Sequence, residues 1–517
     1  MKASDKKLAL TVKAEDDSVE VFIIDSRFKV VERGRGQMNV FSLAPGIYTV
    51  KVKVGTESRS EHVVLLDKPE QVKFARIEFP SAAPLLDTGK THEYHIEASQ
   101  NESKKVHVSI GSGSSIFVFV RDWRPKEKPE MKINPRPQLG LQLLDSTGNV
   151  IVDIDKKAKF EPKRDPCAAC NVQLDPGIYR LALHLQSGSV IEQTVVASPG
   201  WQTQVFMLQR NYGKDRSDRR ADLCGASILM SKSGFSAGDS NKRLVETARL
   251  GLIDTRQVLS EKVINAILMG KFENPMLGIL GAHLLLLNNS VKMGLLDTVV
   301  TNLRKLLGSD LHPDVEALAL RLGKKTSFVF EHPPMLRRSW WHVVDATVNK
   351  KGLVPLGSTA AAAAERIWGA EPWLQWKTAP PARLEAVTTN FGLAAVKNYP
   401  VLESQHLGGD TNLTLQTFSE SGFPIADLFD VTPPQQKEKS LSRKKGRKPT
   451  RKLSVGSIKA KSSATETRTR KSKIKMMVKA SGLPFGNLEA MYDQYISDPS
   501  NTVKSDTKPR TKRLLSR

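Results

Sequence analysis

One phrase occurs twice in the chain and restricts its fold more than any other feature. Residues 43–52 read Leu-Ala-Pro-Gly-Ile-Tyr-Thr-Val-Lys-Val, and residues 174–183 read Leu-Asp-Pro-Gly-Ile-Tyr-Arg-Leu-Ala-Leu. In each copy Pro-Gly forms a turn, and the alternating residues after it predict a β-strand with one buried face. Apolar runs that end in an acidic turn, Val19–Asp25 and Leu139–Asp145, precede the two copies. The repeat therefore predicts two related β-modules, which are more typical of a scaffold than of a reaction centre.

Short strand-like segments separated by Gly, Pro and Asn turns continue to about residue 212. Such a series favours antiparallel β-sandwiches. We expect one sandwich over residues 1–78 and a second over residues 79–212, with Glu93–Ala98 and Ile116–Val120 among the strands of the second. In the strand after the first Pro-Gly turn, Thr49, Lys51 and Lys53 are expected to face water, opposite Tyr48, Val50, Val52 and Val54.

Four segments of the second module resemble the bacterial pre-peptidase C-terminal type of β-sandwich. They are Tyr94–Ala98, Ile116–Val120, Leu141–Asn149 and Leu174–Tyr179. Fibronectin-III-like sandwiches use the same phrases. The resemblance covers about residues 84–210 and implies a non-catalytic accessory module.

Near residue 237 the apolar period changes from two to 3.6, which predicts helices. Asn274-Pro275 and His312-Pro313 each place a cap before a proline at the first helical position. They predict helices over Met276–Leu287, which is apolar almost all round and therefore central, and over Val315–Leu322. The predicted order is a linker at 213–238 and a small helical bundle at 239–325.

Five of the seven tryptophans lie within residues 326–430, a segment of mixed or helical character. They are Trp340, Trp341, Trp368, Trp373 and Trp376. Two interpretations stay open: the indoles pack this segment onto the helical bundle, or they form an exposed aromatic binding surface.

The formal net charge is +24, and it is concentrated near the C-terminus. Residues 437–517 contain 23 Lys/Arg and 6 Asp/Glu, a net of 23 − 6 = +17. We expect residues 431–517 to be a disordered basic tail that binds nucleic-acid phosphates or an acidic partner. Its candidate binding residues are Arg443, Lys444, Lys445, Arg447, Lys448, Arg451, Lys452, Arg468, Arg470, Lys471, Lys473 and Lys475.

The tail contains one apolar stripe of helical spacing, at residues 487–497. Asn487 is the expected cap, and the spacing predicts a short amphipathic helix that docks on a partner's groove or on the chain's own helical region. The expected docking residues are Leu488, Met491, Tyr492, Tyr495 and Ile496.

Two short motifs match the residue patterns of a catalytic serine and of a zinc site. Gly234–Gly238 fits the G-x-S-x-G pattern of hydrolases, and Asp297 and His312 follow Ser236 in the required order. This motif lies between β and helical segments rather than in a parallel α/β sheet, which favours a flexible linker.

Cys167 and Cys170 have the spacing of half a zinc site, which Cys224 and His184 could complete, although free thiols are the simpler interpretation. No metal ion or other cofactor is expected.

The fold expected is multidomain, β then α: two antiparallel β-sandwiches, a helical bundle and a basic tail. Three cysteines, an N-terminus without signal-peptide character and no apolar stretch of bilayer length suggest a cytoplasmic protein. The expected function is a non-enzymatic adaptor or scaffold of an intracellular bacterial assembly, with protein partners of unknown identity. The alternatives are a nucleic-acid-associated protein that binds through the tail and a serine hydrolase that uses Ser236.

Overall fold

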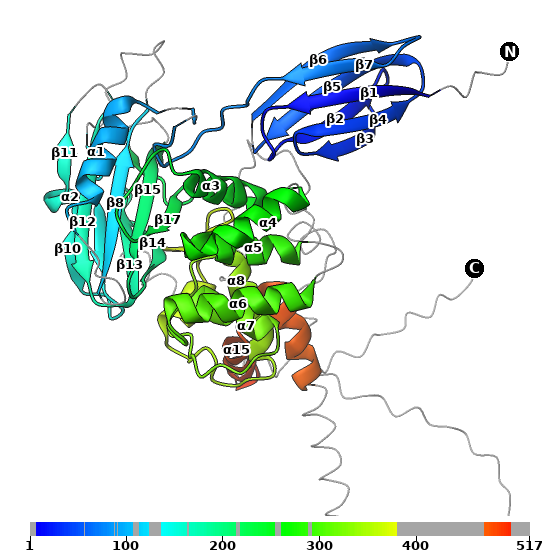
Figure 1. Cartoon of the computed structure of the whole chain (residues 1–517). Coiled ribbons are helices and arrows are strands. Elements are labelled where there is room, and N and C mark those ends of the chain that lie inside the picture. The colour runs from blue at the N-terminus through cyan, green and yellow to red at the C-terminus, as the bar shows by residue number, and fades with distance from the viewer. Residues whose placement is uncertain are drawn as a thin grey trace, which may run out of the picture.

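The computed structural model describes residues 7–379 and 470–497 apart from short gaps, and β-sheets precede helices along the chain (Figure 1). The gaps are residues 56, 87, 90, 107–112, 124–135, 163–164, 214–217, 254–259 and 288–291. Sheets occupy residues 8–231 and helices follow over residues 240–364, so the predicted order of β-modules and helices is confirmed. Among the described residues, no helix is long and apolar enough to cross a membrane.

The first β-module has two sheets, with strand orders β4-β1-β7 and β3-β2-β5-β6. Their buried side chains form one hydrophobic cluster that runs from Leu8 to Phe79. β1 pairs with β4 in the antiparallel sense and with β7 in the parallel sense. The strands are β1 (Leu8–Ala14), β2 (Glu20–Asp25), β3 (Val30–Arg35), β4 (Met38–Leu43), β5 (Gly46–Val54), β6 (Glu57–Leu65) and β7 (Glu70–Phe74).

The second β-module also has two sheets, ordered β10-β9-β13-β14-β19-β18 and β11-β12-β8-β15-β16, and β17 pairs with β15. β8 and β15 are parallel neighbours. Its strands are β8 (Ser114–Arg121), β9 (Leu141–Leu144), β10 (Val150–Asp153), β11 (Lys159–Glu161), β12 (Cys167–Leu174), β13 (Gly177–His184), β14 (Val190–Ala197), β15 (Gln202–Asn211), β16 (Arg219–Ala221), β17 (Ser227–Ser231), β18 (Ile367–Trp368) and β19 (Gln375–Thr378).

The repeated phrase forms the same local structure in both modules. The hydroxyl of Tyr48 donates to the carbonyl oxygen of Ala44 at 2.8 Å, and that of Tyr179 donates to Asp175 at 2.8 Å. Of the two strands that follow these turns, β5 shows strict alternation of buried and more exposed residues and β13 does not. In β13 five consecutive residues, from Tyr179 to Leu183, are buried because both faces of that sheet are covered.

One predicted strand is a helix. Residues 93–98 belong to α1 (Glu93–Ser103), which packs on β12. The buried residues of α1 include His95, Ser99 and Ser103, which recur every four positions as on a helix face. Because these residues are polar, the apolar pattern of the sequence did not reveal this period. The prediction of a strand at residues 93–98 is therefore wrong.

The helical region surrounds a helix that is buried on every side. That helix is α5, which begins at the predicted proline. Asn274 does not cap it; instead its side-chain oxygen accepts from the backbone N–H of Met230 at 3.2 Å. The helices are α2 (Ile154–Lys157) in the second β-module, then α3 (Ser240–Ile253), α4 (Glu261–Met269), η1 (Gly270–Phe272), α5 (Pro275–Leu286), α6 (Met293–Leu307), α7 (Pro313–Arg321), α8 (Arg337–Thr347) and α9 (Thr359–Ala364).

The first β-module contacts the helices through ion pairs at one of its ends. Arg243 of α3 donates to Asp16 at 2.7 Å, and Lys262 of α4 donates to Asp17 at 2.8 Å. The second β-module shares a hydrophobic cluster with α3 to α7, and this cluster runs from Ala82 to Trp373. Leu250 of α3 also packs against the hydrophobic cluster of the first β-module, so both modules have apolar contacts with the helices and the first adds ion pairs.

The tryptophan-rich segment completes the second β-module. β19 pairs with β14, with Trp376 opposite Glu192, so strands nearly two hundred residues apart in sequence are neighbours. The indole of Trp373 is buried and donates to the carbonyl oxygen of Ala226 at 2.7 Å. Trp340 is also buried, whereas Trp341 is 40% exposed. Most of these indoles are packing residues, and those of Trp373 and Trp376 contact the β-module rather than the bundle alone.

Candidate functional site

The C-terminal helices pack back onto the body of the protein. We call helical residues 470–481 together with α15 (Phe485–Ser497) the clasp (Figure 1). The clasp adds apolar side chains to a hydrophobic cluster that α8 and α9 also build. The clasp residues buried in this cluster are Ile474, Val478, Phe485 and Leu488.

Polar contacts fix the position of α15 on this surface. The backbone N–H of Phe485 donates to the hydroxyl of Thr347 at 2.9 Å. The side-chain amide of Asn487 donates to the carbonyl oxygen of Ala361 at 3.2 Å and to the carboxylate of Glu365 at 3.0 Å. Asn487 was predicted to cap the helix, but α15 begins at Phe485 and Asn487 is a buried contact to α9.

Of the predicted docking residues, the structure places Leu488 and Tyr492 in buried positions and Met491 in a partly buried one. The side chains of Tyr495 and Ile496 lie outside the described residues. The guanidinium of Arg470 pairs with Asp493 and lies 5.1 Å from the centroid of the Tyr492 ring. The docking helix therefore occupies its own chain's helical region, which was one of the two predicted receptors.

The candidate basic residues fall partly within the clasp. Arg470, Lys471, Lys473 and Lys475 are helical, and the side chains of Lys471 and Lys475 are exposed. The remaining candidates lie outside the described residues: Arg443, Lys444, Lys445, Arg447, Lys448, Arg451, Lys452 and Arg468. In the sequence, these residues lie between β19 and the clasp.

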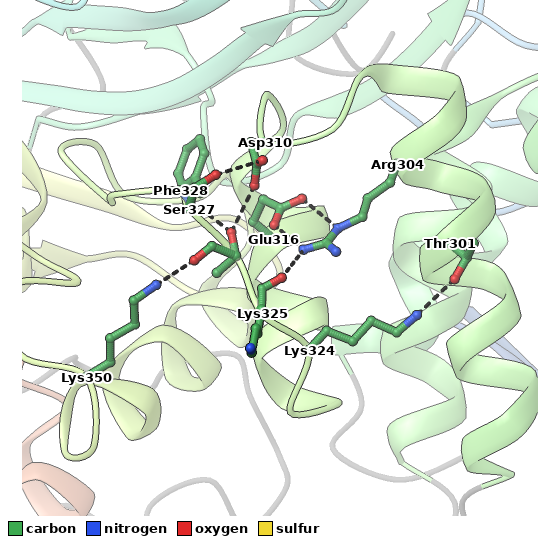
Figure 2. Close-up of polar contacts among 10 residues, drawn as sticks. Thr301, Arg304, Asp310, Glu316, Lys324, Lys325, Ser327, Phe328 and Lys350 are labelled. Carbon is green, nitrogen blue, oxygen red and sulfur yellow. Dashed lines mark hydrogen bonds and ion pairs between the residues drawn. The ribbon is translucent and has the colours of Figure 1, made fainter.

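The receptor surface of the clasp is held by a polar network between α6, α7 and the segment that leads to α8 (Figure 2). Asp310 accepts from the hydroxyl of Thr326 at 3.1 Å and from that of Ser327 at 2.8 Å. The hydrogen bond from Ser327 is the largest cause of the lowered pKa of Asp310. Lys350, just after α8, donates to the carbonyl oxygen of Thr326 at 2.6 Å. These contacts fix the chain immediately before Phe328, which packs against the clasp cluster.

A second part of the network ties the same segment to α6 (Figure 2). Arg304 forms an ion pair with the carboxylate of Glu316 and donates to the carbonyl oxygen of Lys325 at 3.4 Å. Lys324 donates to the hydroxyl of Thr301 at 2.9 Å. Because Glu316 is buried, its pairing with Arg304 satisfies a charge that would otherwise be costly.

Asp314 sets the start of α8. Its two carboxylate oxygens accept from the backbone N–H groups of Met335, at 3.0 Å, and Leu336, at 2.9 Å. Burial raises the pKa of Asp314 to about 6 and lowers the pKa of His312 to about 3. His312 was predicted to cap α7, but it makes no side-chain cap hydrogen bond. No sequence pattern indicates the Asp314 contact, because an aspartate after proline is ordinary in the first turn of a helix.

Ser236 is exposed beside a cavity of about 300 Å³ between β17 and α3. The loop is anchored, since the N–H of Phe235 donates to the hydroxyl of Ser103 at 2.8 Å and that of Ala237 to the side chain of Gln100 at 3.1 Å. Lys242 also lines the cavity; burial lowers its pKa, and its ammonium lies 3.5 Å from Asp239. The predicted linker at 213–238 thus contains β16, β17 and a fixed loop.

The structure does not bring the predicted hydrolase partners to Ser236. Asp297 pairs with Lys324 at 2.8 Å on α6, and His312 is buried next to Asp314. Neither residue lines the cavity beside Ser236. Their order in the sequence matches a triad, but their positions do not converge.

Cys167 and Cys170 lie on strand β12, where residues three apart point to opposite faces. Both thiols are buried, and burial raises the pKa of Cys170 to about 11. Cys224 donates to the side-chain oxygen of Gln375 at 2.6 Å, and His184 is bonded to Gln142. In the part of the chain that the structure describes, no group of three or more His, Cys, Asp or Glu could hold a metal ion.

No protein-family model and no curated protein matches the sequence. Among solved structures, the Bacillus anthracis TIE protein matches 38% of this chain and 30% of its own length, at 13% identity and a TM-score of 0.14. A titin Ig tandem matches 37% of this chain and 93% of its own, at 11% identity and a TM-score of 0.10. The N-terminal eight Ig domains of Down Syndrome Cell Adhesion Molecule match 40% and 28%, at 12% identity and a TM-score of 0.11. These are weak similarities to Ig-like β-sandwich domains, and at such TM-scores no argument about this chain rests on them.

Proposed function

We propose that this protein is a non-enzymatic adaptor of an intracellular assembly, whose folded body holds a basic stretch of chain at both ends. The observation that carries the proposal is the clasp. Leu488 and Tyr492 are buried against the body, so the chain is anchored after residue 469 as well as before residue 380. Residues 380–469 therefore connect two anchored parts of one fold.

The connecting segment has two halves of different charge. Residues 437–469 contain 12 Lys/Arg and 2 Asp/Glu, a net of 12 − 2 = +10, whereas residues 398–430 contain no Lys or Arg. A dense cationic stretch attracts acidic surfaces over about a Debye length. The proposed role is to bring an acidic protein partner to the surfaces of the β-modules.

A second candidate function is association with nucleic acid through the same stretch. The exposed ammonium groups of Lys471 and Lys475 extend its charge onto the clasp. Binding through phosphate contacts would weaken steeply as the salt concentration rises.

Two finer assignments belong to the proposal. The second β-module is proposed to be a sandwich of the pre-peptidase C-terminal type, which its Pro-Gly-Ile-Tyr turn supports and its α1 segment does not. A reducing cytoplasmic setting is proposed because Cys167, Cys170 and Cys224 form no disulfide.

The test compares proteins that co-purify with three tagged forms of the full chain after nuclease treatment. The forms are the wild type, a deletion of residues 437–469, and a control deletion of residues 398–430, which has the same length but removes no Lys or Arg. The adaptor proposal expects a specific acidic protein with the wild type and the control deletion but not with the first deletion. If all three forms retain the same proteins, or if nuclease removes every one of them, the proposal is wrong.

A further inference from the structure

We propose that the outward face of the sheet β3-β2-β5-β6 in the first β-module binds single-stranded nucleic acid. This inference concerns a different part of the chain from the adaptor proposal and does not depend on it. We call this surface the basic sheet face. It comprises Arg33 and Arg35 of β3, Glu20, Phe22 and Ile24 of β2, Thr49, Lys51 and Lys53 of β5, and Ser58, Ser60 and His62 of β6.

The strand register places these side chains in rows across the sheet. Because successive residues of a strand point to opposite faces, the fully buried Val21 and Val52 show that their neighbours point outward. One row runs from Arg33 through Phe22 to Lys51. Neighbouring strands are about 4.8 Å apart, so each row forms a continuous surface.

The face carries an excess of positive charge. It has four cationic side chains, two arginines and two lysines, and one carboxylate, Glu20, which is buried between Arg35 and Lys53 in the register. Arg33 and Arg35 are exposed, and Lys51 and Lys53 are half-buried. Arginine pairs favour phosphate because the guanidinium donates two parallel hydrogen bonds to its oxygens.

The face also offers a surface for stacking. The guanidinium carbon of Arg33 lies 5.5 Å from the centroid of the Phe22 ring. Unpaired bases stack on aromatic rings and on arginine guanidinium planes, and every nucleotide supplies such a base next to its phosphate, whereas the carboxylates of an acidic peptide have no ring to stack. A row of cations with a stacking centre therefore favours single-stranded nucleic acid over an acidic protein.

The face is exposed along its two edge strands, at Arg33 and Arg35 of β3 and at Ser58, Ser60 and His62 of β6, and is buried at Glu20 in between. The ion pairs to the helices are made by Asp16 and Asp17, before β2 begins. The edge strand β6 carries Glu57, Arg59 and Glu61 on the side opposite to the basic sheet face, paired with Val54, Val52 and Val50. Charged residues that point inward at an edge disfavour addition of another strand, so a partner is expected on the face rather than at the edge.

The test measures fluorescence anisotropy of a labelled oligothymidylate of about 16 nucleotides. The full chain without residues 437–469 is used as the starting protein, because that deletion removes the competing basic stretch and leaves every described element intact. Two double variants are compared in it: Arg33→Gln with Arg35→Gln on the face, and Lys13→Gln with Lys73→Gln. The control lysines are exposed and paired on the outward side of the other sheet.

We expect the starting protein to bind at low salt and the face variant to lose at least about tenfold in affinity. Its slope of log K against log salt should fall by about 1.4, which is 0.7 for each lost phosphate contact to a single strand. The control variant should bind like the starting protein, and all forms should show the same thermal unfolding. The proposal is overturned if the starting protein does not bind, if both variants lose equal affinity, or if polyglutamate displaces the oligonucleotide at equal charge. None of these results alters the co-purification test, so the two proposals fail separately.

Discussion

The indole N–H of Trp376 donates to the carboxylate of Glu192 at 2.8 Å, across two strands that are nearly two hundred residues apart in the sequence. Glu192 also accepts from Arg180 at 3.2 Å, so its carboxylate joins β13, β14 and β19. The second β-module is therefore completed by β19, a strand that follows the helices in the sequence.

Replacement of Trp376 should therefore destabilise the whole body rather than one local segment. We expect Trp376→Ala to lower the free energy of unfolding by about 3–5 kcal/mol, because the indole is buried and its loss leaves a cavity. The matched control, Trp341→Ala, removes an indole that is 40% exposed and should cost about 1 kcal/mol or less. Urea unfolding followed by circular dichroism measures both, and equal losses would contradict the assignment.

The buried carboxylate of Asp314 should make stability depend on pH. Burial raises its pKa to about 6 in the folded protein, against 3.8 for an ordinary aspartate, so its contribution is fully present below pH 3.8 and is lost as the pH rises through 6. The difference of 6 − 3.8 = 2.2 corresponds to about 3 kcal/mol. Asp314→Asn cannot titrate, but its amide nitrogen cannot accept from one of the two backbone N–H groups, so it should be less stable than the wild type at pH 4. The difference in stability should then move in favour of the variant by up to this amount between pH 4 and pH 7. Chemical denaturation at several pH values tests this, and a constant difference would refute it.

Asp314→Ala is expected to behave differently from the amide variant. It leaves both backbone N–H groups, of Met335 and Leu336, without acceptors, which should cost about 2–3 kcal/mol at pH 4. The cost should shrink as the pH rises, because the wild type titrates and the variant does not. Asp310→Ala, which removes the acceptor for two hydroxyls near the surface, is the control and should cost about 1 kcal/mol.

The clasp should open when a charge enters its apolar side. Leu488→Asp places a carboxylate at a buried position, whereas Ala490→Asp introduces the same residue at an exposed position of the same helix. We expect the first variant to lose amide protection over residues 470–497 and along α8, measured by hydrogen–deuterium exchange, and the second to keep it. If both variants keep full protection, the helix does not depend on this contact.

The cysteines should be unreactive in the folded protein. The pKa values of Cys170 and Cys224 are raised to about 11 by burial, so at pH 8 only about one thiol in a thousand is ionised. Iodoacetamide should label them slowly before unfolding and rapidly in urea. Zinc content should be the same for the wild type and for Cys167→Ser with Cys170→Ser, because the two side chains point to opposite faces of β12.

Ser236 offers a direct test of the hydrolase alternative. The positions of Asp297 and His312 lead us to expect no labelling of folded protein by a fluorophosphonate probe. Labelling that Ser236→Ala abolishes and that Ser233→Ala leaves unchanged would restore that alternative.

Local signals in the sequence were sufficient for elements whose residues lie close together along the chain. The Pro-Gly-Ile-Tyr phrase specified β5 and β13, since turn chemistry and a period of two act over a few residues. Proline at the first helical position located the starts of α5 and α7. The apolar stripe of α15 predicted a docking helix. In contrast, α1 was predicted as a strand because its buried face is built from polar residues.

The tertiary structure alone decided which of these elements meet. No local pattern pairs Trp376 with Glu192, places the clasp on α8 and α9, or aligns Arg33 with Lys51 across three strands. The reason is physical: turn and helix preferences depend on neighbours in sequence, whereas burial, strand order and charge rows depend on contacts between distant residues. The sequence by itself determined most kinds of elements and the order of β-modules before helices, but not the helix α1 or the late strand β19. Their packing placed the clasp on α8 and α9 and aligned the side chains of the basic sheet face, and the functional proposals rest on these two features.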